Sequence, residues 1–241
     1  MLNLVLSIML FLLPGSENSE WETKNHKSYA YDLETDEFLY TEVHQEIFKE
    51  AKIQEIMSDY INAEGELLSK RILKFGSDPG KPYFRLEDLR NGYIEGAEVI
   101  NTGVVRVFIR ESFDDSLEEE ILRVEEPFVI DGGMTFFFHQ NWDRLVSGET
   151  VYFNFIIPSA MDYFEFRAYK EDTVTIAGRK GMKVKLEIAD FILRAFVDPF
   201  YISYALDDMT VLYYSGISNV KDEEGNSYNV NIDYTFTGDK Q

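Results

Sequence analysis

Polar and apolar residues alternate with a period of two along most of this chain of 241 residues. Successive side chains of a β-strand point to opposite faces, so this alternation is typical of strands that bury one face. The chain is also rich in Phe (19 residues) and Tyr (15 residues), and both favour the half-buried surface of a sheet. We therefore expect a mainly β protein.

Turns rather than helices separate most of the predicted strands, as at residues 63–66 and 222–226. Parallel neighbours would need long crossovers, so the pattern predicts antiparallel pairing. The expected fold is a large curved antiparallel sheet, forming a half-barrel or an open barrel, with one or two short helices. No linker or repeat divides the chain, and we expect one β-rich domain over residues 28–236, followed by a polar tail over 237–241. The predicted strands cover residues 29–33, 37–48, 53–61, 67–75, 83–89, 92–99, 104–109, 151–157, 163–169, 173–176, 182–188, 201–206, 210–215 and 228–236.

Two polar segments are not expected to form strands. Residues 17–27 are interpreted as a polar leader, and residues 114–120 as an acidic loop or a single helical turn. The acidic groups at 114–120 and 222–224 lack the alternating spacing of a calcium-binding loop. We interpret both as solvated loop charge.

One segment has a helical period instead. Within residues 131–146 the apolar side chains recur at spacings of three and four, which predicts an amphipathic helix. Asp131 is placed to cap its start and Gly148 to end it. A second short helix is expected over 190–197, capped by Asp190. The apolar face of the first helix comprises Met134, Phe137, Phe138, Trp142 and Leu145.

The N-terminus carries an apolar run, Leu2 to Leu13, followed by Pro14, Gly15 and Ser16. A bilayer span takes about 20 residues, so this run is too short for a typical transmembrane helix. Although no basic residue precedes it, its length and flank indicate a signal peptide over residues 1–19, with an uncleaved anchor as the alternative. We expect an exported protein in the periplasm of a Gram-negative bacterium, without an integral membrane span after cleavage.

Charge and composition exclude several classes of function. The formal charge of −21, from 23 Lys and Arg against 44 Asp and Glu, argues against nucleic-acid binding, which needs a basic face. The absence of cysteine excludes disulfides, thiolate catalysis and Cys-ligated zinc. Three isolated histidines give no zinc-ligand spacing, and we expect no metal and no cofactor.

The pattern then resembles known proteins. The block from Phe128 to Tyr234 is similar to a family of uncharacterised exported bacterial proteins, and the order of elements resembles the half-barrel carriers of the LolA and LolB type, which escort lipoproteins across the periplasm. Neither resemblance brings a catalytic residue with it. The segments that carry the first resemblance are Asp131–Met134, Trp142–Glu149, Ile157–Ser159, Val197–Phe200 and Tyr214–Asn219.

A curved sheet with a helix over its concave face would enclose an apolar pocket. The leading hypothesis is therefore a non-catalytic binding or carrier protein for an apolar ligand, a lipid or a lipidated protein. An envelope scaffold module is the first alternative. A hydrolase that uses carboxylates or His139, with Asp143 four residues later, is the second. The residues expected to line the pocket are Met134, Phe137, Phe138, Trp142, Phe153, Phe155, Phe164 and Phe166.

Overall fold

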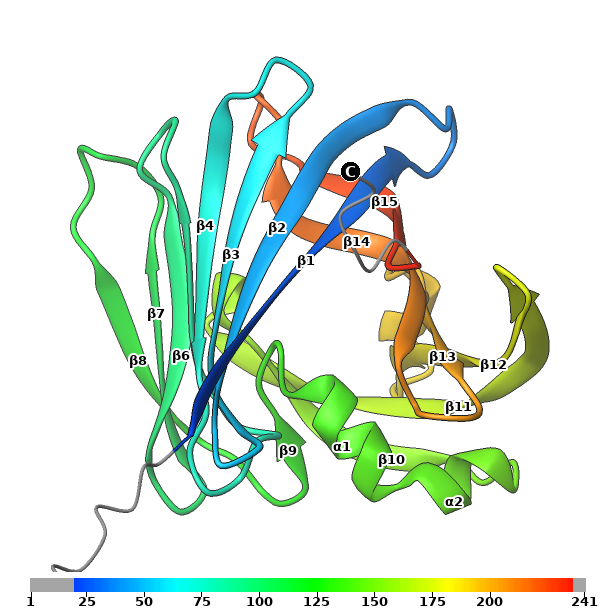
Figure 1. The fold of residues 1–241 in the computed structure, drawn as a ribbon. Helices are drawn as coiled ribbons and strands as arrows, with labels where there is room; N and C mark the ends of the chain where they lie inside the picture. Colours follow the sequence, from blue (N-terminus) through cyan, green and yellow to red (C-terminus); the bar gives the residue numbers. More distant parts are fainter. Residues whose placement is uncertain (1–19, 236–241) are drawn as a thin grey trace, which may run out of the picture.

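Fifteen strands form one curved sheet in this computed structural model, which describes residues 20–235 (Figure 1). The predicted signal peptide, 1–19, and the polar tail, 237–241, lie outside the described residues. The first eight strands are β1 (Trp21–Asp32), β2 (Phe38–Lys49), β3 (Lys52–Asn62), β4 (Leu67–Lys74), β5 (Tyr83–Asp88), β6 (Ile94–Asn101), β7 (Val104–Arg110) and β8 (Glu118–Arg123). The others are β9 (Phe128–Val129), β10 (Val151–Ile157), β11 (Asp162–Ile176), β12 (Arg179–Ile188), β13 (Phe200–Ala205), β14 (Val211–Lys221) and β15 (Ser227–Asp233).

The chain builds the sheet in two meanders that meet in its middle. Strands β1 to β8 run outward to one edge, the chain then crosses to β9 at the opposite edge, and β10 to β15 return to pair with β1. Every strand pair is antiparallel except β9 with β10, which is parallel. The predicted curved antiparallel sheet is thus confirmed, with one short parallel exception at its edge.

The β1–β15 seam is short. These strands pair only over Tyr29–Asp32, whereas β1 pairs with β2 from Trp21 onward. Residues 21–28 therefore have a strand partner on one side only, within the described chain. This segment includes most of the predicted polar leader, so the expectation of a leader is wrong there. Its backbone hydrogen bonds to β2 outweigh its poor apolar pattern.

The acidic segment at 114–120 is also partly a strand. Glu118, Glu119 and Glu120 begin β8, an edge strand in which Leu122 is buried. An edge strand needs only one apolar contact row, and charges along it are common because they discourage pairing with other chains. The prediction of a loop or helical turn is therefore wrong from Glu118 onward.

The predicted helix over 131–146 is divided into α1 (Met134–Gln140) and α2 (Trp142–Val146), with Asn141 between them. Asp131 does not cap it, because the N-cap is Gly133 and no side chain caps that end. Gly148 does follow α2 with a positive φ of 89°, as expected.

In place of the second predicted helix the structure has one 3-10 turn, η2 (Leu193–Ala195). Asp190 is not its N-cap, which is Ile192, but the Oδ1 atom of Asp190 accepts hydrogen bonds from the N–H groups of Ile192 and Leu193. Phe191 and Phe196 stay exposed. A short helix without a surface to pack on is not stable alone.

Two apolar clusters fill the interior. One lies among β1 to β8 and includes side chains of β9, β10, β14 and β15. The other packs α1 and Leu145 of α2 onto β10 to β13. The second includes Phe138, whose ring centroid lies 6.1 Å from that of Tyr204. These contacts hold α1 against the concave side of the sheet (Figure 1).

Candidate functional site

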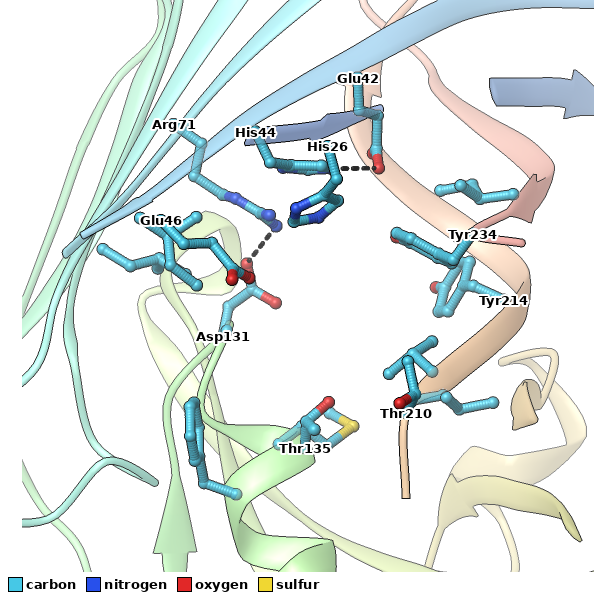
Figure 2. A pocket seen from close by; sticks show the side chains of 18 of the residues that line it. His26, Glu42, His44, Glu46, Arg71, Asp131, Thr135, Thr210, Tyr214 and Tyr234 are labelled. Carbon is cyan, nitrogen blue, oxygen red and sulfur yellow. Dashed lines mark hydrogen bonds and ion pairs between the residues drawn. The ribbon is translucent and has the colours of Figure 1, made fainter. Parts of the chain in front are cut away.

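A cavity of about 930 Å³ lies between α1, the inner faces of β1 to β4, and β13 to β15. It is partly open to solvent, and its lining includes Lys24 and Asn25 from the half of β1 that pairs with β2 alone, and the exposed Ile217 from β14. Figure 2 shows side chains from both walls and from α1 converging on this space. The cavity is large enough for a small organic ligand.

Strand register places a polar row along one wall. His26 on β1 lies opposite His44 on β2, His44 lies opposite Ser58 on β3, and Ser58 lies opposite Arg71 on β4. Cross-strand neighbours of this kind share one face of a sheet. Four strands thus bring four polar side chains together on the concave face.

Glu42 is the buried acceptor beside this row. Its Oε2 accepts a 2.6 Å hydrogen bond from Ser28 Oγ and lies 3.1 Å from His44 Nε2, and His44 Nδ1 lies 2.8 Å from Ser58 Oγ. Burial by itself would raise the pKa of Glu42, but the hydrogen bond and charge of His44, with Arg71 and Ser28, outweigh it and hold that pKa well below its usual range. Glu42 is therefore an ionised carboxylate at neutral pH.

Arg71 uses few of its donors. Guanidinium offers five N–H groups, yet the hydrogen bond recorded for it among the described residues is a long one of 3.4 Å to Ser58 Oγ. Its Nε is buried without a partner. Asp131 Oδ2 lies 3.7 Å from Nη1, beyond hydrogen-bond range, and accepts instead from Asn219 at 3.0 Å. Figure 2 shows Arg71 directed at Asp131 across the upper part of the cavity.

His26 completes the polar wall as a neutral group. Its ring centroid lies 4.6 Å from that of His44, and no hydrogen bond joins it to another described residue. Burial, together with the neighbouring His44, lowers the pKa of His26 to about 4. The neutral imidazole can therefore offer one donor and one acceptor to a ligand.

The predicted pocket residues are divided between the cavity and the core. Met134 and Phe155 line the cavity. The other six do not, because the apolar stripe of α1 packs against β10 to β13, and the neighbouring face of the helix, with Thr135 and His139, points to the cavity. The buried cluster between α1 and the sheet contains Phe137, Phe138, Phe153 and Phe166, and Trp142 and Phe164 pack partly buried against it.

His139 does not pair with Asp143, as the hydrolase alternative would require. Its Nε2 lies 3.0 Å from the carbonyl oxygen of Met209, and Asp143 is exposed at the start of α2. The order Glu42, His44, Ser58 resembles a hydrolytic triad, but Ser58 is only 1% exposed and does not line the cavity. A substrate in the cavity therefore has no serine oxygen to meet on this wall.

Among the described residues, no group of three or more His, Cys, Asp or Glu side chains is arranged to hold a metal ion. The predicted acidic loop at 222–224 is a tight turn, in which Asp222 Oδ1 accepts from the N–H groups of Glu224 and Asn226. The Asp222 carboxylate is therefore engaged in its own turn.

Sequence reasoning missed Arg71, His26, His44, Glu42 and Asp131 as cavity residues. The sequence did contain one signal for these residues. Glu42, His44 and Glu46 are every second residue of β2, so their side chains share one face of the strand. That face is charged and would ordinarily be taken as the solvent side.

No protein-family model matches the chain, and no curated protein matches it in sequence. A solved structure described as a beta-barrel-like protein of domain of unknown function DUF1849 from Brucella abortus is similar in fold, with a TM-score of 0.53 over 87% of this chain and 95% of that chain. Sequence identity between them is 7%, so the likeness concerns the fold alone. Within residues 20–235, no helix has both the length and the apolar character of a membrane span.

Proposed function

We propose that this protein binds an amphipathic small molecule, such as a lipid or the lipid part of a protein, and carries it outside the cytoplasm. One observation supports this most directly: a cavity of about 930 Å³ with a polar wall and an apolar remainder inside the curved sheet. Apolar pockets with a few convergent polar groups are the usual setting for small-molecule sites. Binding rather than catalysis fits the buried position of Ser58.

Native mass spectrometry of gently purified protein tests the proposal. We expect the intact chain to carry an added mass that organic extraction releases. A chain at its own mass that also fails to bind fluorescent amphiphiles would overturn the proposal.

A matched pair of variants tests the location of the site. Ile56 lines the cavity from β3, whereas Ile100 at the end of β6 is exposed elsewhere. Ile56→Trp should fill part of the cavity and weaken binding of an amphiphile about ten-fold or more, equivalent to about 1.4 kcal/mol. Ile100→Trp should leave binding unchanged, and equal effects of the two variants would contradict this location.

Export is the second part of the proposal and rests on the apolar run Leu2–Leu13. We expect fractionation of cells to place the protein in the periplasm, with an N-terminus near residue 20. Retention of Met1 in the mature protein would contradict cleavage, and a cytoplasmic location would contradict export.

An envelope interaction module is the alternative function, and one surface favours it. Phe191, Ile192 and Phe196 around η2 are 80%, 69% and 83% exposed, and exposed apolar patches often mark protein contacts. Cross-linking in intact cells would distinguish the functions: a stoichiometric protein partner that is lost in Phe196→Ser would favour the interaction module.

A further inference from the structure

Arg71 presents unused hydrogen-bond donors beside the cavity. Its side chain is 19% exposed, it has one long hydrogen bond to Ser58, and its Nε is buried without a partner. Buried polar groups are normally satisfied, and a planar guanidinium matches the paired oxygens of a phosphate or carboxylate. The Nη groups of Arg71 can therefore donate to an oxyanion or another strong acceptor placed in the cavity.

Carboxyl groups share the cavity with this guanidinium. Asp131 lies 3.7 Å from Arg71 without a hydrogen bond to it, and Glu42 is held ionised by His44 on the same wall. Glu46 also lines the cavity, and its side chain forms no ion pair or hydrogen bond with another residue of the described chain. Burial raises the pKa of Glu46 more than the charges of His44 and Lys24 lower it, so a cation from a ligand would further stabilise its carboxylate.

A ligand head of one charge sign would leave part of this wall unsatisfied. An isolated anion would meet Arg71 but be repelled by Asp131, Glu42 and Glu46. An isolated cation would meet those carboxyl groups but be repelled by Arg71, whose donors would remain unused. Lys24, the other cation of the lining, is half-exposed and pairs with Glu22.

Resting on the proposed binding function, we propose that the head of the bound amphiphile is a zwitterion. Its oxyanion, a phosphate or carboxylate, binds Arg71 and can accept from His26. Its ammonium group lies against Asp131 and Glu46. The apolar part extends toward Phe155, Phe200 and Ile202, which line the cavity away from the polar row.

A panel of single-chain amphiphiles with the same acyl chain tests the head. It comprises an acyl phosphoethanolamine, an acyl phosphoglycerol, a fatty acid and an alkylammonium salt, with free phosphoethanolamine as the head without a chain. We expect the acyl phosphoethanolamine to bind the wild-type protein about ten-fold more tightly than the acyl phosphoglycerol, as for one charge-assisted contact. Equal or tighter binding of the anionic lipid overturns the zwitterion.

Three variants assign the two halves of the head. Arg71→Met should weaken the binding of both phosphate lipids about ten-fold or more and leave the binding of the alkylammonium salt unchanged. Arg71→Lys should recover part of the lost affinity. Asp131→Asn should reduce the preference for phosphoethanolamine over phosphoglycerol. Arg85→Met is the control, because it removes an arginine of β5 that does not line the cavity. It should change neither the affinities nor the preference for phosphoethanolamine. Melting temperatures check that each variant is folded. Unchanged binding of the phosphate lipids by folded Arg71→Met, or an unchanged preference for phosphoethanolamine in folded Asp131→Asn, overturns the proposal.

The panel also separates the two proposals. If no member binds, the proposed function fails and the zwitterion fails with it. If members bind but prefer one charge sign, only the zwitterion fails. If free phosphoethanolamine binds as tightly as the acylated form, the zwitterionic head stands and the amphipathic ligand fails.

Discussion

Arg71 Nη1 and Asp131 Oδ2 face each other at 3.7 Å inside the cavity, opposite in charge but beyond hydrogen-bond range. Arg71 comes from the middle of β4, and Asp131 from the turn that leads into α1. Their separation leaves the guanidinium free to take a ligand oxygen. The same geometry indicates that the pair contributes little to folding.

A double-mutant cycle with Arg71→Met and Asp131→Asn measures that contribution in the ligand-free protein. We expect a coupling free energy of about 1 kcal/mol or less, because the contact is loose and partly solvated. Denaturant unfolding of the four proteins provides the measurement. A coupling of several kcal/mol would show that the pair is a structural ion pair instead of a ligand site.

Glu95 on β6 predicts a pH dependence of stability. It is 5% exposed and accepts a 3.1 Å hydrogen bond from the Tyr93 hydroxyl. Burial, with the charge of Asp131, raises the pKa of Glu95 to about 7. The unfolded chain has the lower pKa, so this group favours the folded state below that value, and the contribution is lost as pH rises through about 7.

Glu95→Gln removes this titration while keeping an acceptor for Tyr93. Its free energy of unfolding should exceed that of the wild type by about 3 kcal/mol near pH 8, and the difference should shrink toward zero near pH 4. Urea titrations across this pH range test it. A constant difference at all pH values would mean that Glu95 does not titrate as inferred.

Gly133 predicts a steric effect at the start of α1. A Cβ there would lie 2.1 Å from the backbone oxygen of Gly80, and backbone cannot move aside as a flexible side chain can. Gly133→Ala should therefore lower the free energy of unfolding by about 2 kcal/mol. Gly76→Ala is the matched control, since a Cβ at Gly76 meets nothing within 4 Å, and it should change stability by less than about 0.5 kcal/mol.

Phe138 and Phe196 form a further matched pair. Phe138, on the buried face of α1, is 0% exposed, whereas Phe196, beside η2, is 83% exposed. Phe138→Ala should cost about 3–5 kcal/mol of unfolding free energy, whereas Phe196→Ala should cost almost nothing. Thermal or urea unfolding measures both, and a mild effect of Phe138→Ala would return that side chain to the cavity wall predicted from the sequence.

The sequence predicted the sheet because period two is a local signal. Strands such as β2 and β10 alternate strongly, and their short connections allow antiparallel pairing. The start of β1 and the whole of β8 were missed because they are polar, and only their hydrogen bonds to β2 and β7 make them strands.

The cavity could be anticipated but its lining could not. A helix over a concave sheet implied an enclosed space, yet which face of α1 meets that space depends on packing against β10 to β13. On β2, Glu42 and His44 alternate with Thr41 and Val43. Polarity alone would place the side chains of Thr41 and Val43 in the interior and those of Glu42 and His44 in solvent. The opposite orientation is stable because Ser28 and Ser58, on neighbouring strands, hydrogen-bond to Glu42 and His44, and the charge of Arg71 favours the Glu42 carboxylate. Such long-range partners cannot be read from one strand.

The short seam between β1 and β15 has a consequence for the cavity. Residues 21–28 leave one backbone edge without a strand partner in the described chain, and Lys24, Asn25 and His26 within them line the cavity. An extended segment that added to this edge would lie beside these lining residues. Strand addition by a peptide would therefore change the wall of the cavity as well as the edge of the sheet.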